Sequence, residues 1–192
     1  TRHYPIEDAE AKTTWDYNPD GSAKQVTDPR GAVTDITYNV LGSTTQIAYT
    51  PVSGLPDTPT VTFGYDDLGN RVSMDTAGVS EVTYAYDPLS RMTSETVNFD
   101  DLANNLTIGY TYGLTGLKSI TDPSGKEIEY AKDRAGRLTA VTGDAFGQNT
   151  TGTYASGIEY RAFGQVKQMD YNLSNGNSRI KLNYDNRLRV DH

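Results

Sequence analysis

The chain has 192 residues, 35% of them hydrophobic, and a formal net charge of −8. It contains no cysteine, which excludes disulfides, thiolate nucleophiles and cysteine-ligated metals. The acidic balance argues against a nucleic-acid partner, which needs a basic patch, and no apolar run approaches the roughly 20 residues that membrane insertion requires. Abundant Thr, with 14 Tyr and 18 Gly, favours β-strands joined by tight turns.

The motif Tyr-Asp/Asn-x-x-Gly recurs along the whole chain. Its tyrosine, here called the anchor, stands at Tyr17, Tyr38, Tyr65, Tyr86, Tyr112, Tyr160 and Tyr184, with Lys132 in the anchor place of one copy. The turn glycine follows four residues later at Gly21, Gly42, Gly69, Gly116, Gly136 and Gly164, with Ser90 in its place once. Intervals between anchors alternate between shorter and longer, so the pattern repeats after about two anchors, a period of roughly 48 residues.

A second turn motif appears once in each double repeat. It reads Asp-Pro-Arg-Gly at Asp28–Gly31, Asp-Thr-Ala-Gly at Asp75–Gly78 and Asp-Pro-Ser-Gly at Asp122–Gly125. The Asp side chain can accept bonds from the backbone ahead of it, Pro presets φ, and Gly adopts the following position without steric cost. These residues predict a tight turn of the same type as the tyrosine motif.

The segments before the anchors alternate apolar and polar residues, as in Val61-x-Phe63-x-Tyr65. Period two places the rings on one face of a strand. With turn signals about every ten residues, the sequence predicts an all-β fold of repetitive antiparallel hairpins forming a curved or spiralling sheet. If the strands meander, the tyrosine turns share one edge, and the opposite edge alternates Asp-x-x-Gly turns with long loops that carry specific contacts.

Three segments are expected. Residues 1–14 form an N-terminal lead-in, residues 15–190 form the repeat β domain with about eight anchors, and residues 191–192 are the remnant of a tag.

No catalytic, cofactor-binding or metal site is expected. The only histidines, His3 and His192, lie at the two ends, which disfavours a catalytic triad or a histidine-based metal site. The row of tyrosines is interpreted as structural, although exposed rings could also stack on sugars or a peptide. The arginines after the turns are expected to pair with the turn aspartates; they are Arg71, Arg91, Arg137 and Arg187.

The units "YAYDPLSRMT" and "DTAG" resemble the tyrosine-aspartate (YD) or Rhs repeat, and the resemblance covers nearly the whole chain. Such repeats occur in bacterial Rhs and polymorphic toxins, in the cocoons of insecticidal toxin complexes and in teneurin ectodomains. The resemblance implies a β-ribbon that coils into a hollow shell around a toxic cargo domain, with the tyrosines and turn glycines holding the wall. The repeats themselves carry no catalysis.

The chain departs from that family pattern in two ways. Eight anchors are few for an enclosing shell, and the self-cleaving Asp-Pro-x-Gly-Leu type junction is missing, because the turns at Asp28 and Asp122 are internal and lack the Leu. The chain is therefore expected to be either a segment of a larger shell or a short version that completes itself by assembly.

The predicted function is a non-catalytic structural scaffold, extracellular or at the bacterial cell surface after export. Its expected partners are the remainder of a larger repeat shell or copies of itself joined by β-edge pairing, with an encapsulated toxin domain as cargo. The alternative is a module that binds a surface glycan or receptor through long loops and exposed tyrosines.

Overall fold

In the computed structural model, the described residues are 2–3, 12–144, 151–173 and 176–191, and every element in them is a β-strand. The chain forms two compact units, Thr1–Leu106 and Thr107–His192. None of the described residues belongs to a helix that could cross a bilayer.

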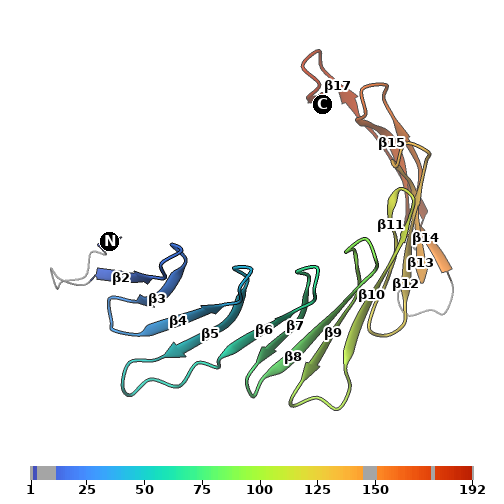
Figure 1. Ribbon diagram of the computed structural model, residues 1–192. Coiled ribbons are helices and arrows are strands. Elements are labelled where there is room, and N and C mark those ends of the chain that lie inside the picture. Colours follow the sequence, from blue (N-terminus) through green and yellow to red (C-terminus); the bar gives the residue numbers. More distant parts are fainter. Residues whose placement is uncertain (1, 4–11, 145–150, 174–175, 192) are drawn as a thin grey trace. The chain divides into compact units, whose positions relative to one another are not determined.

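Unit 1 is a meander in which each strand pairs antiparallel with the next (Figure 1). Its strands are β1 (Arg2–His3), β2 (Lys12–Tyr17), β3 (Ala23–Thr27), β4 (Val33–Tyr38), β5 (Thr44–Thr50), β6 (Val61–Tyr65), β7 (Arg71–Thr76), β8 (Ser80–Tyr86) and β9 (Met92–Phe99). Strand β2 starts at Lys12, within residues 1–14, the segment predicted as an N-terminal lead-in.

Unit 2 repeats the same topology. Its strands are β10 (Leu106–Gly113, starting at the unit boundary), β11 (Gly116–Thr121), β12 (Glu127–Lys132), β13 (Leu138–Asp144), β14 (Thr151–Tyr160), β15 (Val166–Leu173), β16 (Gly176–Lys181), β17 (Asn183–Tyr184) and β18 (Val190–Asp191). Strands β10 to β16 pair consecutively, and β17 pairs with β18 as a separate hairpin. The predicted all-β fold of antiparallel hairpins is confirmed.

The two faces of the sheet differ in chemistry because side chains alternate along each strand. In unit 1 the partners Phe63, Met74, Val82 and Val97 form an apolar row across β6 to β9. The neighbouring residues in the same strands turn to the other face, where the row reads Gly64, Ser73, Thr83 and Thr96. The alternation predicted from the sequence is thus realised across strands.

The hydrophobic core is small. Among the described residues only Val82, Ala155 and Ile158 are buried hydrophobic residues, while Ser119, at 1% exposure, is the most buried polar residue. The Ser119 hydroxyl shares a 2.6 Å hydrogen bond with the Thr111 hydroxyl on the adjacent strand. With so little enclosed interior, stability depends on neighbouring strands holding one another.

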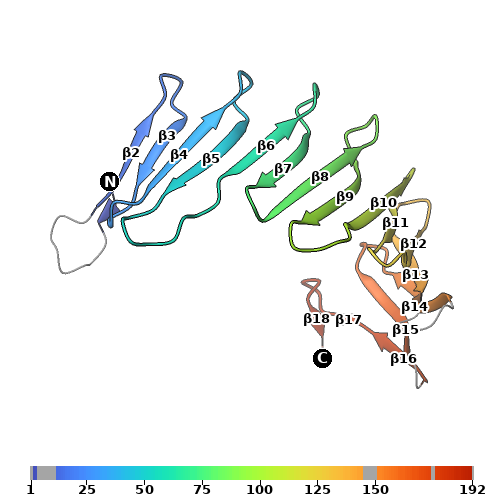
Figure 2. The ribbon, with the colours of Figure 1, turned by 90° about the horizontal axis from the view of Figure 1, so that it is seen from below.

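The connections sort onto two edges, as Figure 2 shows for unit 1. The turns β2–β3, β4–β5, β6–β7 and β8–β9 follow the anchors and lie along one edge, which we call the tyrosine-turn edge. The opposite edge, the loop edge, carries the β3–β4 and β7–β8 turns and the long β5–β6 connection, residues 51–60. Within unit 1, the predicted division into two unlike edges is therefore confirmed.

Candidate functional site

The tyrosine turn is built from its own backbone and one aspartate, as the turn at Asp66 shows. The Asp66 N–H donates to the Asn70 carbonyl at 2.9 Å, and the Gly69 N–H donates to the Asp66 carbonyl at 3.0 Å. The Asp66 carboxylate then accepts from the N–H groups of Leu68 and Asn70 at 3.0 and 2.8 Å. Gly69 has φ +84°, so the loop has the form of a tight turn followed by a left-handed glycine.

The same pair of side-chain bonds recurs in four other copies. Asn39, Asp87, Asp133 and Asp185 each accept from the two backbone N–H groups two and four residues ahead. The predicted turn glycines have positive φ, and Ser90 and Leu188 take this conformation with φ 58° and 60° in the copies that lack glycine. The glycines are Gly21, Gly42, Gly69, Gly116, Gly136 and Gly164.

Two of the three predicted Asp-x-x-Gly turns have this geometry. Asp28 and Asp122 cap the backbone of their turns through the same pair of N–H bonds, and Gly31 and Gly125 have positive φ. Asp75 differs from the prediction because it lies inside β7, paired with Thr62 and Glu81. That turn is closed instead by the Val79 N–H, which donates to the Thr76 carbonyl at 2.9 Å, with Gly78 at φ +69°.

The anchors join successive hairpins through their hydroxyl groups. Tyr65 donates to the Thr44 carbonyl at 2.7 Å, and Thr44 is the residue that pairs with the preceding anchor, Tyr38, across its own hairpin. We call this set of bonds the tyrosine ladder. The bonds are Tyr38 to Ala23 at 2.9 Å, Tyr65 to Thr44 at 2.7 Å, Tyr86 to Arg71 at 2.9 Å, Tyr160 to Leu138 at 2.9 Å and Tyr184 to Val166 at 2.7 Å.

Every acceptor in the ladder is the cross-strand partner of the preceding anchor. Ala23 pairs with Tyr17 just beyond a bulge in the β2–β3 register, and each of the other acceptors pairs beyond a bulge in its own hairpin. A bulge takes a backbone carbonyl out of the regular hydrogen bonding between strands. The tyrosine hydroxyl of the next repeat donates to that carbonyl. Burial raises the pKa of the Tyr86 hydroxyl, which favours the protonated, donating form.

Two of the three remaining anchor positions are described by their own contacts. Lys132 occupies the anchor place of its copy, and its Nζ donates to the Thr115 carbonyl at 3.1 Å. Tyr17 is 61% exposed, the most exposed anchor, and its hydroxyl has no hydrogen bond within the described part of the chain.

The arginines after the turns follow two different patterns. Arg91 and Arg137 form ion pairs with Asp87 and Asp133 at 2.6 and 2.7 Å, as predicted. In the final copy Asp185 pairs with Arg189 and not with the predicted Arg187. The prediction was also wrong for Arg71, whose guanidinium lies over the rings of Tyr84 and Phe63 at 5.1 and 5.7 Å from their centroids.

The last two copies are joined by contacts that the sequence did not predict. Arg161 stands where six other copies have Asp or Asn and one has Gly113, and its guanidinium donates to the Leu182 carbonyl at 3.1 Å. The Phe163 and Tyr184 rings meet edge to face with their centroids 5.6 Å apart. The only sign of this contact in the sequence was the aromatic residue Phe163 at the turn tip. The contact itself depends on where the chain after β16 places Tyr184.

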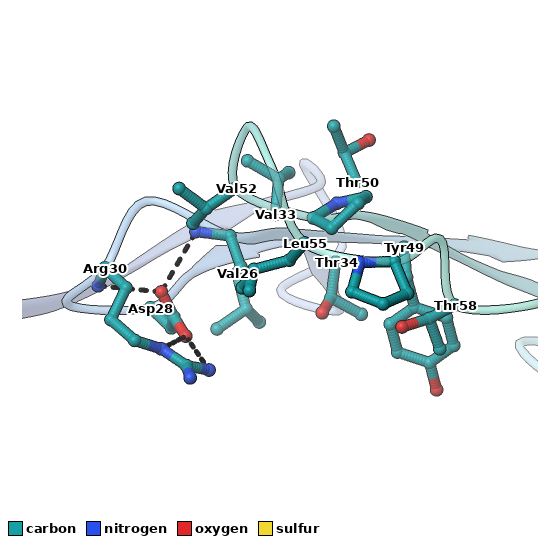
Figure 3. Close-up of a pocket in the computed structure, with 13 residues that line it drawn as sticks. Val26, Asp28, Arg30, Val33, Thr34, Tyr49, Thr50, Val52, Leu55 and Thr58 are labelled. Carbon is teal, nitrogen blue, oxygen red and sulfur yellow. Dashed lines mark hydrogen bonds and ion pairs between the residues drawn. The ribbon is translucent and has the colours of Figure 1, made fainter.

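The loop edge of unit 1 has a pocket of about 470 Å³ beneath the long β5–β6 connection (Figure 3). Val26, Val33, Val52 and Leu55 give it an apolar lining, and the ion pair between Arg30 and Asp28, at 2.8 Å, lies at its rim. A second, shallower pocket is lined by Gly78, Val79, Phe99, Asp101 and Leu102.

Within residues 2–3, 12–144, 151–173 and 176–191, no three His, Asp or Glu side chains converge to hold a metal ion. The side chain of His3 and the whole of His192 lie outside the described residues. What the repeated residues do is structural: they cap turns and join hairpins.

Comparison with known proteins agrees with this architecture. Residues 6–143 match the family described as the Teneurin YD-shell. The fold is similar to the crystal structure of TcdB2-TccC3 without its hypervariable C-terminal region, with a TM-score of 0.79 and 15% identity over 93% of this chain. It is also similar to the Photorhabdus luminescens Tc holotoxin pore carrying a TccC3 mutation, with a TM-score of 0.74, 15% identity and the same coverage.

In both comparisons this chain spans 10% of the length of the larger chain. No curated protein matches.

Proposed function

Because this chain belongs to the Teneurin YD-shell family, we propose that it serves as a load-carrying wall segment of an exported YD-repeat shell and carries no catalysis of its own. Its partners in this proposal are further stretches of the same kind of wall and a toxin domain that the complete shell encloses. The proposal places the chain outside the cell or on its surface, as the resemblance to toxin shells and teneurin ectodomains suggests.

The tyrosine ladder is the observation that supports this role. The residue that defines the repeat is used to bond one hairpin to the next, at 2.7 to 2.9 Å in five copies. A hydroxyl that is already half-buried and bonded to backbone is not free to recognise a ligand. The Tyr17 hydroxyl, which has no hydrogen bond to the described residues, is a donor of the same kind on an exposed ring, and the carbonyl of a neighbouring hairpin is the acceptor it would take.

The test is a chimera. The stretch of the TcdB2-TccC3 shell that matches this chain is replaced by residues 12–191, and electron microscopy shows whether shells form. A wall segment is expected to give closed shells that protect the enclosed domain from added protease as well as the parent shell does. Closed shells that leave the enclosed domain open to digestion would overturn the proposal.

A second candidate function is glycan binding at the pocket beneath the β5–β6 connection. The Tyr49 ring is exposed there, and hydroxyls of Thr34, Thr50 and Thr58 line the same pocket (Figure 3). An aromatic surface beside hydroxyl groups suits a sugar ring, which presents both apolar and polar faces.

A thermal-shift titration against a glycan panel tests the second candidate, because a ligand that binds only the folded chain raises its Tm. Binding that Tyr49→Ala abolishes would support it. Unchanged melting with every glycan would leave the wall role as the function supported by this structure.

A further inference from the structure

The tyrosine-turn edge of unit 1 presents three exposed leucines in succession. Leu41, Leu68 and Leu89 stand at the same place in the β4–β5, β6–β7 and β8–β9 turns, and they are 73%, 73% and 72% exposed. The turn itself does not require an apolar residue here, because the β2–β3 turn has Asp20 at this position. Exposed leucine side chains that their own turns do not require indicate a surface that contacts something else.

The loop edge of the same unit has hollows with apolar linings. The first, lined by Val26, Val52 and Leu55, lies between the β3–β4 turn and the β5–β6 connection. The second, lined by Val79, Phe99 and Leu102, lies between the β7–β8 turn and the start of the connection after β9. Each hollow is therefore at the base of one hairpin, β4–β5 for the first and β8–β9 for the second.

Those two hairpins carry Leu41 and Leu89 at their tips. Leu41 and Leu89 are four strands apart, as are the two hollows, which corresponds to about 19 Å at a strand spacing of about 4.8 Å. A translation along the strand direction would bring both leucines over both hollows without a sideways shift. The hairpin between them, β6–β7, has Leu68 at its tip, and neither hollow is lined by a residue of β6 or β7.

The charges beside these positions do not oppose the contact. Asp101 lines the second hollow, and at the corresponding tip Arg91, two residues after Leu89, is ion-paired with Asp87 of its own turn. At the first hollow the ion pair of Asp28 and Arg30 already compensates its own charge, and residues 39–43 around Leu41 carry no charged side chain.

We propose that the loop edge of unit 1 binds the tyrosine-turn edge of a second copy of this chain, with Leu41 in the first hollow and Leu89 in the second. The inference rests on the proposed wall role and states how one stretch of wall stacks on another. The contact is heterologous, because it joins two different edges, so each added copy leaves one edge of either kind free and the stack can continue.

Sedimentation velocity of the whole chain over a concentration series tests the proposal. The parent is expected to associate from a 21.0 kDa monomer into a ladder of larger species. The double variant Leu41→Ser/Leu89→Ser is expected to associate about a hundredfold more weakly, because two leucine side chains lose their burial. Leu68→Ser is the matched control, equally exposed and in the same turn position, and is expected to associate like the parent.

A variant altered on the loop edge tests the same contact without changing the leucines of the tyrosine-turn edge. Leu55→Asp/Leu102→Asp is expected to stop self-association in the same way. Mixed with Leu41→Ser/Leu89→Ser it is expected to give a 1:1 complex and nothing larger, because that pair retains one intact edge of each kind. Circular dichroism of each variant shows that the sheet is retained.

Two results would overturn the proposal: a parent that stays monomeric at every concentration, or a Leu68→Ser variant that weakens association as much as the double variant does. If the first hollow binds a glycan and not a second copy, Leu41→Ser would leave self-association unchanged. A negative result in this sedimentation test would not contradict the wall role. The wall role is tested separately, by the protease protection of the enclosed domain in the chimera.

Discussion

Lys132 donates from its Nζ to the Thr115 carbonyl at 3.1 Å, at the place in its repeat where five other copies use a tyrosine hydroxyl. The exchange coincides with a different turn in the preceding hairpin. There Tyr112 pairs with Leu117, five residues on, whereas the other anchors pair with the residue six positions on. The shorter turn changes which carbonyl is available, and the long flexible side chain of lysine reaches it.

Removing this bond should destabilise the chain. Lys132→Met keeps most of the aliphatic stem and removes the donor, so the free energy of unfolding is expected to fall by about 0.5 kcal/mol, the low end for a single hydrogen bond. Urea unfolding measures it. Lys24→Met, at an exposed strand position, is the control and should change little; equal losses in the two variants would contradict a role for the bond.

The tyrosine ladder makes a second prediction. Tyr65→Phe deletes the hydroxyl that bonds the Thr44 carbonyl at 2.7 Å and leaves the ring in place. The expected loss is about 1 kcal/mol, since the carbonyl then lies part-buried without its partner. Tyr49→Phe provides the comparison, because the Tyr49 ring lies exposed at the loop edge. A ladder with no energetic value would give two indistinguishable urea midpoints.

The left-handed position in the tyrosine turn gives a third prediction. Gly69→Val should destabilise by about 1–2 kcal/mol, because φ +84° brings Cβ toward the backbone carbonyl. Ser90 occupies the same place in its turn with φ 58°, so Ser90→Gly should raise stability. Thermal melts of both variants test the pair. Opposite signs are expected, and a destabilised Ser90→Gly would show that the Ser90 side chain contributes more than its strain costs.

The turn aspartates predict sensitivity to acid. The side-chain hydrogen bond from Asn70 lowers the pKa of Asp66, and backbone N–H donors add to the effect. A folded-state pKa below the unfolded value of about 3.9 gives stability that is present above that value and is lost as pH falls through the folded pKa. Asp66→Asn keeps an acceptor for the backbone, as Asn39 shows in its own turn, but cannot titrate.

Urea unfolding at about pH 7 and about pH 3 measures this effect. The Asp66→Asn variant should lose less stability between the two conditions than the parent does. Asp66→Ala, which removes the acceptor, should be less stable than Asp66→Asn at both. A parent and an Asp66→Asn variant with the same acid loss would show that the lowered pKa does not contribute to folding.

Local chemistry explains why so much of the fold could be predicted. The all-β fold of antiparallel hairpins was predicted correctly because period-two alternation and turn residues act over a few neighbouring positions. Asp75 was misplaced for the same reason. Its motif resembles the other two turns, but pairing with Thr62 and Glu81 extends β7 through it, and that pairing depends on strands on both sides.

The ladder acceptors could not be predicted. Tyr65 and Thr44 are 21 residues apart, and their bond depends on the bulge beside Tyr38 that turns the Thr44 carbonyl toward the next hairpin. Arg71 likewise could be expected to pair with Asp66, yet it lies over Tyr84, because the neighbouring strand brings an aromatic face close to it.

The sequence by itself determined the hairpins, their order and the edge on which each kind of turn lies, since each of these depends on contacts between residues close along the chain. Only the tertiary structure decided which carbonyls accept from the tyrosine hydroxyls and which groups the arginine side chains contact. It also decided that exposed leucines and apolar hollows lie at opposite ends of the same hairpins. Those relationships depend on bulges and on neighbouring strands, which set the position of each group in space and leave no local pattern in the sequence.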